Sequence, residues 1–247
     1  MGIVNITPDS FYSESRSLDP HLVLEKVVYM VDNQVDIVDL GAMSSRPGAE
    51  IISPEEELKR ILPSFKLIRM KFPSLFISID TLHAQVAEAC LSHGADMIND
   101  ISAFSVDKNL ISVVSKQNIP ENMQQKPEYD DVSLDVLSFL KNKVNQLRNA
   151  GINDIIIDPG FGFGKSIDDN YQILNDLEVF KILELPILVG LSRKSMIYRP
   201  LGVKAEESLA ATTALHLLAL QKGANILRVH DVKEAQQAVN LFNLLNI

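Results

Sequence analysis

The chain has 247 residues, 46% of them hydrophobic, and no Gly/Ser/Pro-rich linker divides it, so we predict one domain with one large core over residues 1–247. The formal net charge of −9 excludes a general attraction for nucleic acid or an anionic membrane surface, and no apolar run is long enough to span a membrane. Cys90 is the single cysteine and no signal peptide is recognisable, so we expect a reducing, cytoplasmic compartment.

Short β-branched runs alternate with amphipathic helical runs along the chain. Strands are predicted at 2–7, 35–41, 75–80, 97–102, 154–160, 186–192 and 226–231, and helices at 21–33, 54–71, 83–93, 133–150, 168–183, 206–222 and 233–245. Such alternation is typical of a parallel sheet with helical crossovers, and its repetition favours an α/β fold of the (β/α)8 TIM-barrel type. No G-x-G-x-x-G motif follows the first strand, which weakens the dinucleotide-binding alternative.

Several helix ends carry recognisable signals. Ser53 is placed to cap the helix that begins at Pro54. Gly94, Gly151 and Gly223 each follow a predicted helix, as glycines at the C′ position do.

Only seven strands are predicted, because the span 118–132 contains no strand pattern. A barrel without its fifth strand would leave two sheet edges unpaired. We therefore expect that roughly ten residues, an ordinary strand with its loop, are absent from this sequence between Pro120 and Glu121. A true deletion is the alternative, and it would favour a barrel that binds ligands without turnover.

Nearly every predicted strand ends in polar side chains. They are Asn5, Thr7, Asp39, Asp80, Asn99, Asp100, Asp158, Ser192, Arg193, Lys194, Arg228 and His230. The carboxyl ends of barrel strands form the active-site rim, so we expect these groups to meet there. The alternative, that strands end in polar residues because loops are polar, would suffice for one strand but not for seven.

Basic residues also gather at this rim, although the protein is acidic. Arg46 follows the strand at 35–41, Arg193 and Lys194 follow the strand at 186–192, and Arg228 and His230 end the strand at 226–231. Barrels often bind phosphate after the last two strands, and the arginine fork suits phosphate, so we predict an anion site. A solvated surface charge is the alternative for Arg193; Arg228 fits it less well because an apolar strand surrounds it.

A glycine-rich turn, DPGFGFGK, covers residues 158–165. It lacks the spacing of a phosphate-binding P-loop, so we expect its glycines to let the backbone turn tightly beside a flat ligand. Asp158 could accept two N–H donors from an amino-pyrimidine ring, and Asn99 could donate and accept along the same edge.

These motifs together resemble the dihydropteroate synthase family over almost the whole chain. The resemblance lies in residues 1–11 (MGIVNITPDSF), 39–48 (DLGAMSSRPG), 77–81 (ISIDT), 98–100 (IND), 158–165 (DPGFGFGK), 192–195 (SRKS) and 228–231 (RVHD), in the family's order. It implies a transferase of folate biosynthesis, a sulfonamide target, that joins 6-hydroxymethyl-7,8-dihydropterin diphosphate to 4-aminobenzoate, with release of diphosphate. It also implies a homodimer.

The resemblance implies a role for each rim residue. Asp80, Lys194, Arg228 and His230 would be catalytic. The pterin would bind Asp80, Asn99, Asp158, Phe163 and Lys194; the diphosphate would bind Asn5, Arg46, Arg228 and His230, with Mg²⁺ at Asn5. The 4-aminobenzoate would contact Ser45, Pro47, Phe163, Lys194 and Ser195, and Asp39 would have a supporting role. Because Asn99 and Asp158 lie on the fourth and sixth strands, away from the last strand, we expect Arg228→Ala to stop turnover but to spare binding of a pterin without diphosphate.

Two details depart from the family pattern. Ser45 stands where many members have threonine, and the loop after Phe11 lacks the usual glycine pair. The main rival is a methyltetrahydrofolate-type pterin methyltransferase. It would share the Asp and Asn contacts to pterin but would not need a cluster of Arg, Lys and His for diphosphate.

Overall fold

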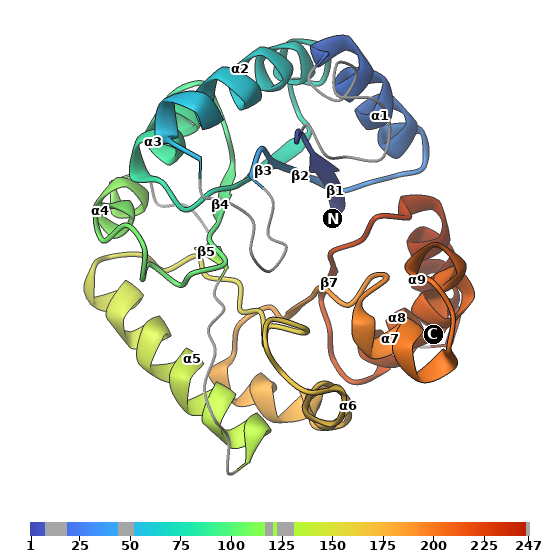
Figure 1. Cartoon of the computed structure of the whole chain (residues 1–247). Coiled ribbons are helices and arrows are strands. Elements are labelled where there is room, and N and C mark those ends of the chain that lie inside the picture. The colour runs from blue at the N-terminus through green and yellow to red at the C-terminus, as the bar shows by residue number, and fades with distance from the viewer. Residues whose placement is uncertain (8–18, 44–51, 117–120, 123–130, 246–247) are drawn as a thin grey trace.

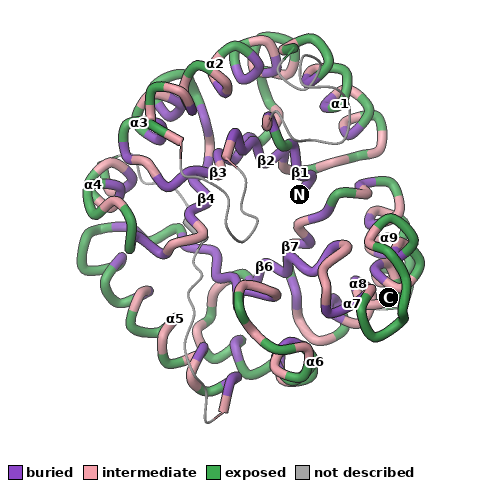
Figure 2. Tube along the Cα trace, in the orientation of Figure 1, coloured by how far each residue is buried: buried purple, intermediate pink, exposed green. Residues whose placement is uncertain are grey.

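The computed structural model describes residues 1–7, 19–43, 52–116, 121–122 and 131–245. Within these ranges the strands form an inner ring and the helices lie around it (Figure 1). The residues that face the inside of this arrangement are mostly buried (Figure 2). The chain is therefore arranged as the predicted α/β barrel. None of the helices in the described ranges combines the length and the apolar character needed to cross a membrane.

The first half of the ring is one parallel sheet. It contains β1 (Gly2–Asn5), β2 (Ile37–Gly41), β3 (Phe76–Asp80), β4 (Met97–Asn99) and β5 (Glu121–Asn122), in that order. The register aligns Gly41 with both Asn5 and Asp80, and Asp80 with Asn99. Polar residues that end neighbouring strands are thus brought to one level of the barrel, as the sequence predicted.

The second half contains β6 (Leu188–Val189) and β7 (Ile226–Leu227), which are also parallel. The predicted strand at 154–160 is reduced to a single bridge, Ile157 to Ile187. A further bridge from Gly2 to Val229 joins this half to β1, and the amide of Ile3 donates to the carbonyl of Val229 at 2.9 Å. The N-terminal strand therefore lies beside the segment that follows β7.

The prediction that no strand lies within 118–132 is wrong. Glu121 and Asn122 form β5, in which Glu121 pairs with Ile98 and Asn122 with Asn99. Two residues are too few to show a period of two, and neither is apolar or β-branched, so the sequence pattern could not reveal this strand. Pro120 lies outside the described residues, and the expected absence of residues before Glu121 stays a prediction.

The helices follow the predicted order with small changes of boundary. They are α1 (Pro20–Asp32), α2 (Pro54–Lys71), α3 (Ala84–Ser92), α4 (Asn109–Ser115), α5 (Val132–Asn149), α6 (Ile167–Asn175), η1 (Leu177–Leu183), α7 (Ser195–Leu201), η2 (Ala205–Glu207), α8 (Leu209–Gln221) and α9 (Val232–Leu245). The helix predicted at 168–183 is divided into α6 and η1.

The expected helix caps are confirmed. The Ser53 hydroxyl accepts a hydrogen bond from the amide of Glu56 at 3.3 Å. Gly94, Gly151 and Gly223 all have positive φ, the conformation that a C′ glycine supplies.

Candidate active site

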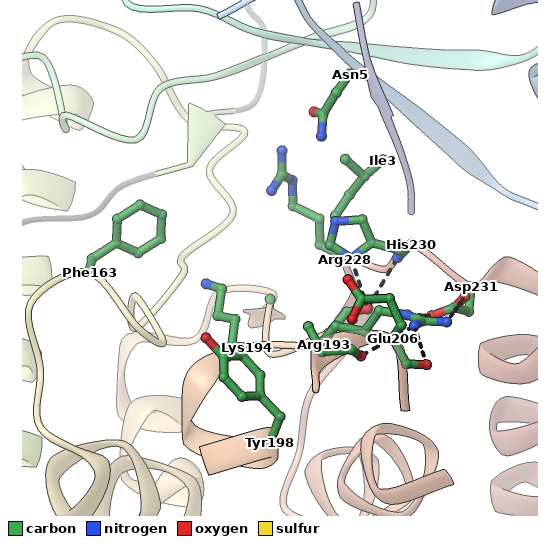
Figure 3. A pocket seen from close by; sticks show the side chains of 13 residues that line it. Ile3, Asn5, Phe163, Arg193, Lys194, Tyr198, Glu206, Arg228, His230 and Asp231 are labelled. Carbon is green, nitrogen blue, oxygen red and sulfur yellow. Dashed lines mark hydrogen bonds and ion pairs between the residues drawn. The ribbon is translucent and has the colours of Figure 1, made fainter. Parts of the chain in front are cut away.

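A cavity of about 630 Å³ opens at the carboxyl ends of β1, β6 and β7 (Figure 3). It is lined by Ile3, Asn5, Phe163, Gly190, Ser192, Arg193, Lys194, Tyr198, Ala205, Glu206, Arg228, His230 and Asp231. Strand ends from both halves of the barrel therefore contribute to one space. Its position and polar lining are those expected of a TIM-barrel active site.

Arg228 joins two carboxylates across the barrel. Its Nε lies 2.7 Å from Oδ2 of Asp39, and one terminal nitrogen lies 2.7 Å from Oδ2 of Asp80. The same oxygen of Asp39 accepts a hydrogen bond from the amide of Asn99 at 3.0 Å. Arg228 therefore forms an ion pair with Asp80, one of the residues assigned to the pterin. The expectation that loss of Arg228 spares pterin binding rested on Asn99 and Asp158, and it stays a prediction.

Burial controls the charge of this cluster. It raises the pKa of Asp80 from 3.8 to about 7; the Arg228 guanidinium opposes that shift and the nearby Asp39 carboxylate adds to it. Burial also disfavours the charged form of Arg228, but Asp39 and Asp80 outweigh it and raise the Arg228 pKa. The guanidinium stays charged, whereas Asp80 is poised between two protonation states near neutral pH.

Lys194 lies directly above the glycine-rich turn. Its ammonium donates to the carbonyl of Phe161 and lies 4.6 Å from the ring centroid of Phe163, a distance typical of a cation–π contact. Burial lowers the Lys194 pKa to about 8, although Asp158 opposes the shift. Gly162 has φ +87°, and a Cβ there would lie 3.2 Å from Cδ of Lys194. Glycine therefore supplies the positive φ of this turn, and its lack of a side chain leaves room for Lys194.

Asp158 is placed where the sixth strand was expected. Its side chain is buried, and Oδ1 accepts a hydrogen bond from the amide of Gly160 at 2.8 Å. Lys165 donates to the carbonyl of the same glycine at 2.8 Å. These contacts fix the first turn of the DPGFGFGK segment and hold the Asp158 carboxylate at the inner end of the rim.

His230 and Arg193 form the opposite wall. Ser192 Oγ accepts a hydrogen bond from the His230 amide at 3.2 Å and lies 3.1 Å from its Nδ1. Burial lowers the pKa of His230 to about 4, and Lys26 adds to the shift. Because the residue is exposed at the cavity mouth, water weakens this effect.

Arg193 is neither a solvated charge nor an open anion ligand. Its Nε lies 2.7 Å from Oδ2 of Asp231, and a terminal nitrogen lies 2.8 Å from Oδ1. It also donates to the carbonyl of Glu206 at 2.9 Å. The guanidinium is thus bound within the wall and orients the segment that follows β6.

Other predicted residues are placed differently. Asp100 is fully buried and accepts hydrogen bonds from the amides of Ser102 and Phe104 at 2.7 and 2.8 Å, so it shapes a turn and does not line the cavity. Asn99 is buried beside Asp39, and Ser195 begins α7. Ser45, Arg46 and Pro47 lie outside the described residues.

The sequence did not single out six of the lining residues: Ile3, Gly190, Tyr198, Ala205, Glu206 and Asp231. Ile3 carried a signal, because it stands two positions before Asn5 on β1 and so faces the same way. Tyr198 carried another. It stands four positions after Lys194, so a helix beginning at Ser195 places both side chains on one face.

The cavity offers little for a resident metal ion. No group of three or more His, Cys, Asp or Glu side chains converges within the described parts of the chain. Asn5 ends β1 and contributes one neutral amide oxygen to the cavity. Magnesium commonly keeps several waters and binds substrate phosphates together with one or two protein ligands. This donor set fits a magnesium ion that is held mainly by an anionic substrate.

Comparisons with known proteins agree over almost the whole chain. The family model for pterin-binding enzymes matches residues 1–230. A dihydropteroate synthase of Clostridium beijerinckii is 41% identical over 251 residues, covering 99% of this chain and 93% of that protein. The Xanthomonas albilineans dihydropteroate synthase solved with 4-aminobenzoic acid has a TM-score of 0.94 at 36% identity, covering 100% of this chain and 92% of that chain. The same enzyme in complex with 7,8-dihydropteroate has a TM-score of 0.91 at 35% identity, with the same coverage.

Proposed function

The chain belongs to the pterin-binding enzyme family and has dihydropteroate synthase function, and from that premise we propose how its residues share the reaction. The enzyme is a transferase with a TIM-barrel fold that condenses 6-hydroxymethyl-7,8-dihydropterin diphosphate with 4-aminobenzoate. The proposed assignment rests above all on Arg228, which lies between Asp39 and Asp80 at the cavity. The curated dihydropteroate synthases that match almost the whole chain favour this function over the pterin methyltransferase alternative.

The pterin ring binds at Asp80, Asn99, Asp158, Lys194 and Phe163. Asn99 and Asp158 are buried and present an amide and a carboxylate at strand ends. Such groups match the alternating donors and acceptors of an aminopyrimidine edge. Phe163 and the ammonium of Lys194 already lie together, and a flat ring fits beside them.

The diphosphate binds at Asn5, Arg46, Arg228 and His230. The Arg228 guanidinium and the Asn5 amide line the same cavity as His230, so a charged leaving group would meet donors from two strand ends. Asn5 would be a protein ligand of Mg²⁺. When bound, magnesium would neutralise part of the charge that develops on diphosphate.

The 4-aminobenzoate binds on the other side of Lys194, against Phe163 and Ser195, with Ser45 and Pro47 completing the site. Its amine nitrogen forms a bond to the methylene carbon of the pterin while the bond from that carbon to diphosphate oxygen breaks. The nitrogen then releases one proton to water. Asp80, when ionised, stabilises positive charge on the pterin as the leaving group departs.

Lys194→Ala tests this assignment, because Lys194 would contact both substrates. We expect weaker pterin binding and a loss of condensation on the order of 10²–10³. Pterin affinity is measured by calorimetry, and diphosphate release is followed with and without 4-aminobenzoate. Lys181→Ala is the matched control, because Lys181 lies on η1 and pairs only with Glu178 among the ion pairs of the described residues. Near-normal turnover of Lys194→Ala would remove Lys194 from the site.

We also propose a cytoplasmic homodimer. Cys90 is buried and free, which suits a reducing compartment. α8 has apolar residues on all sides, and an apolar groove between α8 and α9 is lined by Leu209, Leu217 and Leu241 among others. A helix of this kind is normally buried. Leu241 is 56% exposed in the single chain, so Leu241→Glu should halve the mass measured by light scattering if this face joins two copies.

A further inference from the structure

A buried carboxylate and a partly buried histidine form a pair that does not line the cavity. Glu57, in the first turn of α2, is fully buried, and the Nδ1 of His83, just before α3, lies 2.7 Å from its Oε2. The Glu57 Oε1 has no hydrogen-bond partner among the described residues. Burying a carboxylate is unfavourable even when it is paired, and a buried ion pair often adds no stability over apolar residues. The pair therefore calls for a role besides stability.

Thr81 connects this pair to the active site. It follows Asp80 directly and is fully buried. Its hydroxyl accepts a hydrogen bond from the amide of His83 at 3.1 Å, and it helps to lower the pKa of Glu57. The Thr81 amide donates to the carbonyl of Asn99 at 3.1 Å. His83, which Glu57 holds through its ring, thus fixes the residue next to the Asp80 carboxylate.

The pair also acts on Asp80 through charge. The negative charge of Glu57 is one of the causes, after burial and the neighbouring Asp39, that raise the pKa of Asp80. A protonated His83 opposes the charge of Glu57 at close range. His83 lies close enough to offset the charge of Glu57, so its removal changes the electrostatic field that acts on Asp80.

We propose that Glu57 and His83 are positioning residues for Asp80, with Thr81 as the link that orients the carboxylate and with His83 placed to offset the charge of Glu57. This inference rests on the proposed role of an ionised Asp80. Other charged or titratable groups that act on the pair are Glu55 and Arg60 of α2, Cys90 of α3 and Asp107 before α4. All remain unchanged in the variants below.

The experiment compares pH profiles of kcat for variants that change one feature each. Turnover needs ionised Asp80 and falls as pH falls through its pKa. Glu57→Gln removes the negative charge, so the acid limb should move to lower pH. His83→Ala leaves Glu57 uncompensated, so the limb should move to higher pH, and His83→Lys should restore it. Thr81→Val should lower kcat about tenfold at every pH, because a small misplacement of a catalytic group is costly.

Controls separate this inference from the proposed function. Asp80→Asn should remove the acid limb and most of the turnover; if it does not, the proposed role of Asp80 fails. Glu56→Gln changes an exposed neighbour that pairs with Arg60, and it should leave the profile unchanged. If Asp80→Asn behaves as expected while folded Glu57→Gln and His83→Ala keep the profile of the wild type, the inference is overturned and the pair is structural. If His83→Ala does not fold, the Glu57→Gln variant is sufficient for the test. The acid limb of its kcat profile must still move to lower pH.

Discussion

Arg228 makes contacts that the sequence could not foresee. Its pairs with Asp39 and Asp80 neutralise two carboxylates that would otherwise repel each other inside the barrel. The second oxygen of Asp39 has no hydrogen-bond partner within the described ranges. Loss of the guanidinium would therefore leave the negative charge of this buried carboxylate without its ion pair.

Arg228→Ala should therefore impair both functions of the rim. We expect turnover to fall by on the order of 10²–10³, as for loss of a preorganised charge. Binding of a pterin without diphosphate should weaken too, because Asp80 would become harder to ionise. Calorimetry with such a pterin measures this directly. Unchanged affinity would instead support the expectation from the sequence, that pterin binding does not depend on Arg228.

Asp80→Asn should make the protein more stable at alkaline pH. The folded-state pKa of Asp80, about 7, lies above its ordinary value of 3.8, so between these values the folded state binds more protons than the unfolded chain. Stability is therefore lost as pH rises through this window. Asparagine cannot ionise, so the variant does not lose this stability. Its melting temperature should exceed that of the wild type at pH ~8, and the difference should vanish below pH ~4. Melting temperatures across pH test this, with Asp154→Asn as an exposed control.

The sequence predicted where functional residues lie along the strands, but not what each one contacts. Asp80, Asp158 and Lys194 could be placed because polar groups at strand ends follow from the barrel pattern. Asp100 also ends a predicted strand, but its carboxylate accepts a hydrogen bond from the amide of Phe104 and stabilises a turn. The pairing of Arg193 with Asp231 depends on two segments 38 residues apart, which no local pattern reveals.

At the scale of elements, α8 contains an unusual buried group. His216 is 2% exposed, and both ring nitrogens lack hydrogen-bond partners among the residues that the structure describes. Burial lowers its pKa from 6.5 to about 4, although Asp231 opposes the shift. The folded state therefore binds fewer protons than the unfolded chain between these values, and stability is lost as pH falls through them.

His216→Leu should remove this acid sensitivity. We expect its melting temperature to exceed that of the wild type, and the difference to grow as pH falls from ~7 to ~5. Leucine does not bind a proton, so its folding is not coupled to protonation. His93→Gln changes an exposed histidine of the α3 end and should not alter the slope. Parallel melting curves for His216→Leu and the wild type would contradict the prediction.

Long amphipathic helices were predictable almost to the residue, as α2 shows, because their caps and their periodic apolar faces agree. Short elements were not. The segment around Ile157 makes one bridge only, and β5 has two residues. Their positions are set by neighbouring strands, so tertiary pairing decides them and local propensity does not.

At the scale of the whole molecule, we still expect residues to be absent before Glu121. The alignment with the Clostridium relative runs over 251 positions, more than the 247 residues of this chain, so that relative contains residues without a counterpart here. Intact mass spectrometry of the natural protein should give more than 27.4 kDa, and peptide mapping should place the additional residues after Pro120. A mass equal to that of this sequence would establish a true deletion.

The ion pairs of Arg228 also constrain the order of events during synthesis and folding. They connect residues 189 and 148 positions apart, and the last bridge of the ring joins Gly2 to Val229. Contacts of such long sequence separation form slowly, since the whole intervening chain must be ordered first. On a ribosome, the first five strands would emerge well before their cationic partner. Enzymatic competence is thus acquired last, and in refolding we expect the return of turnover to lag behind the return of helical circular dichroism.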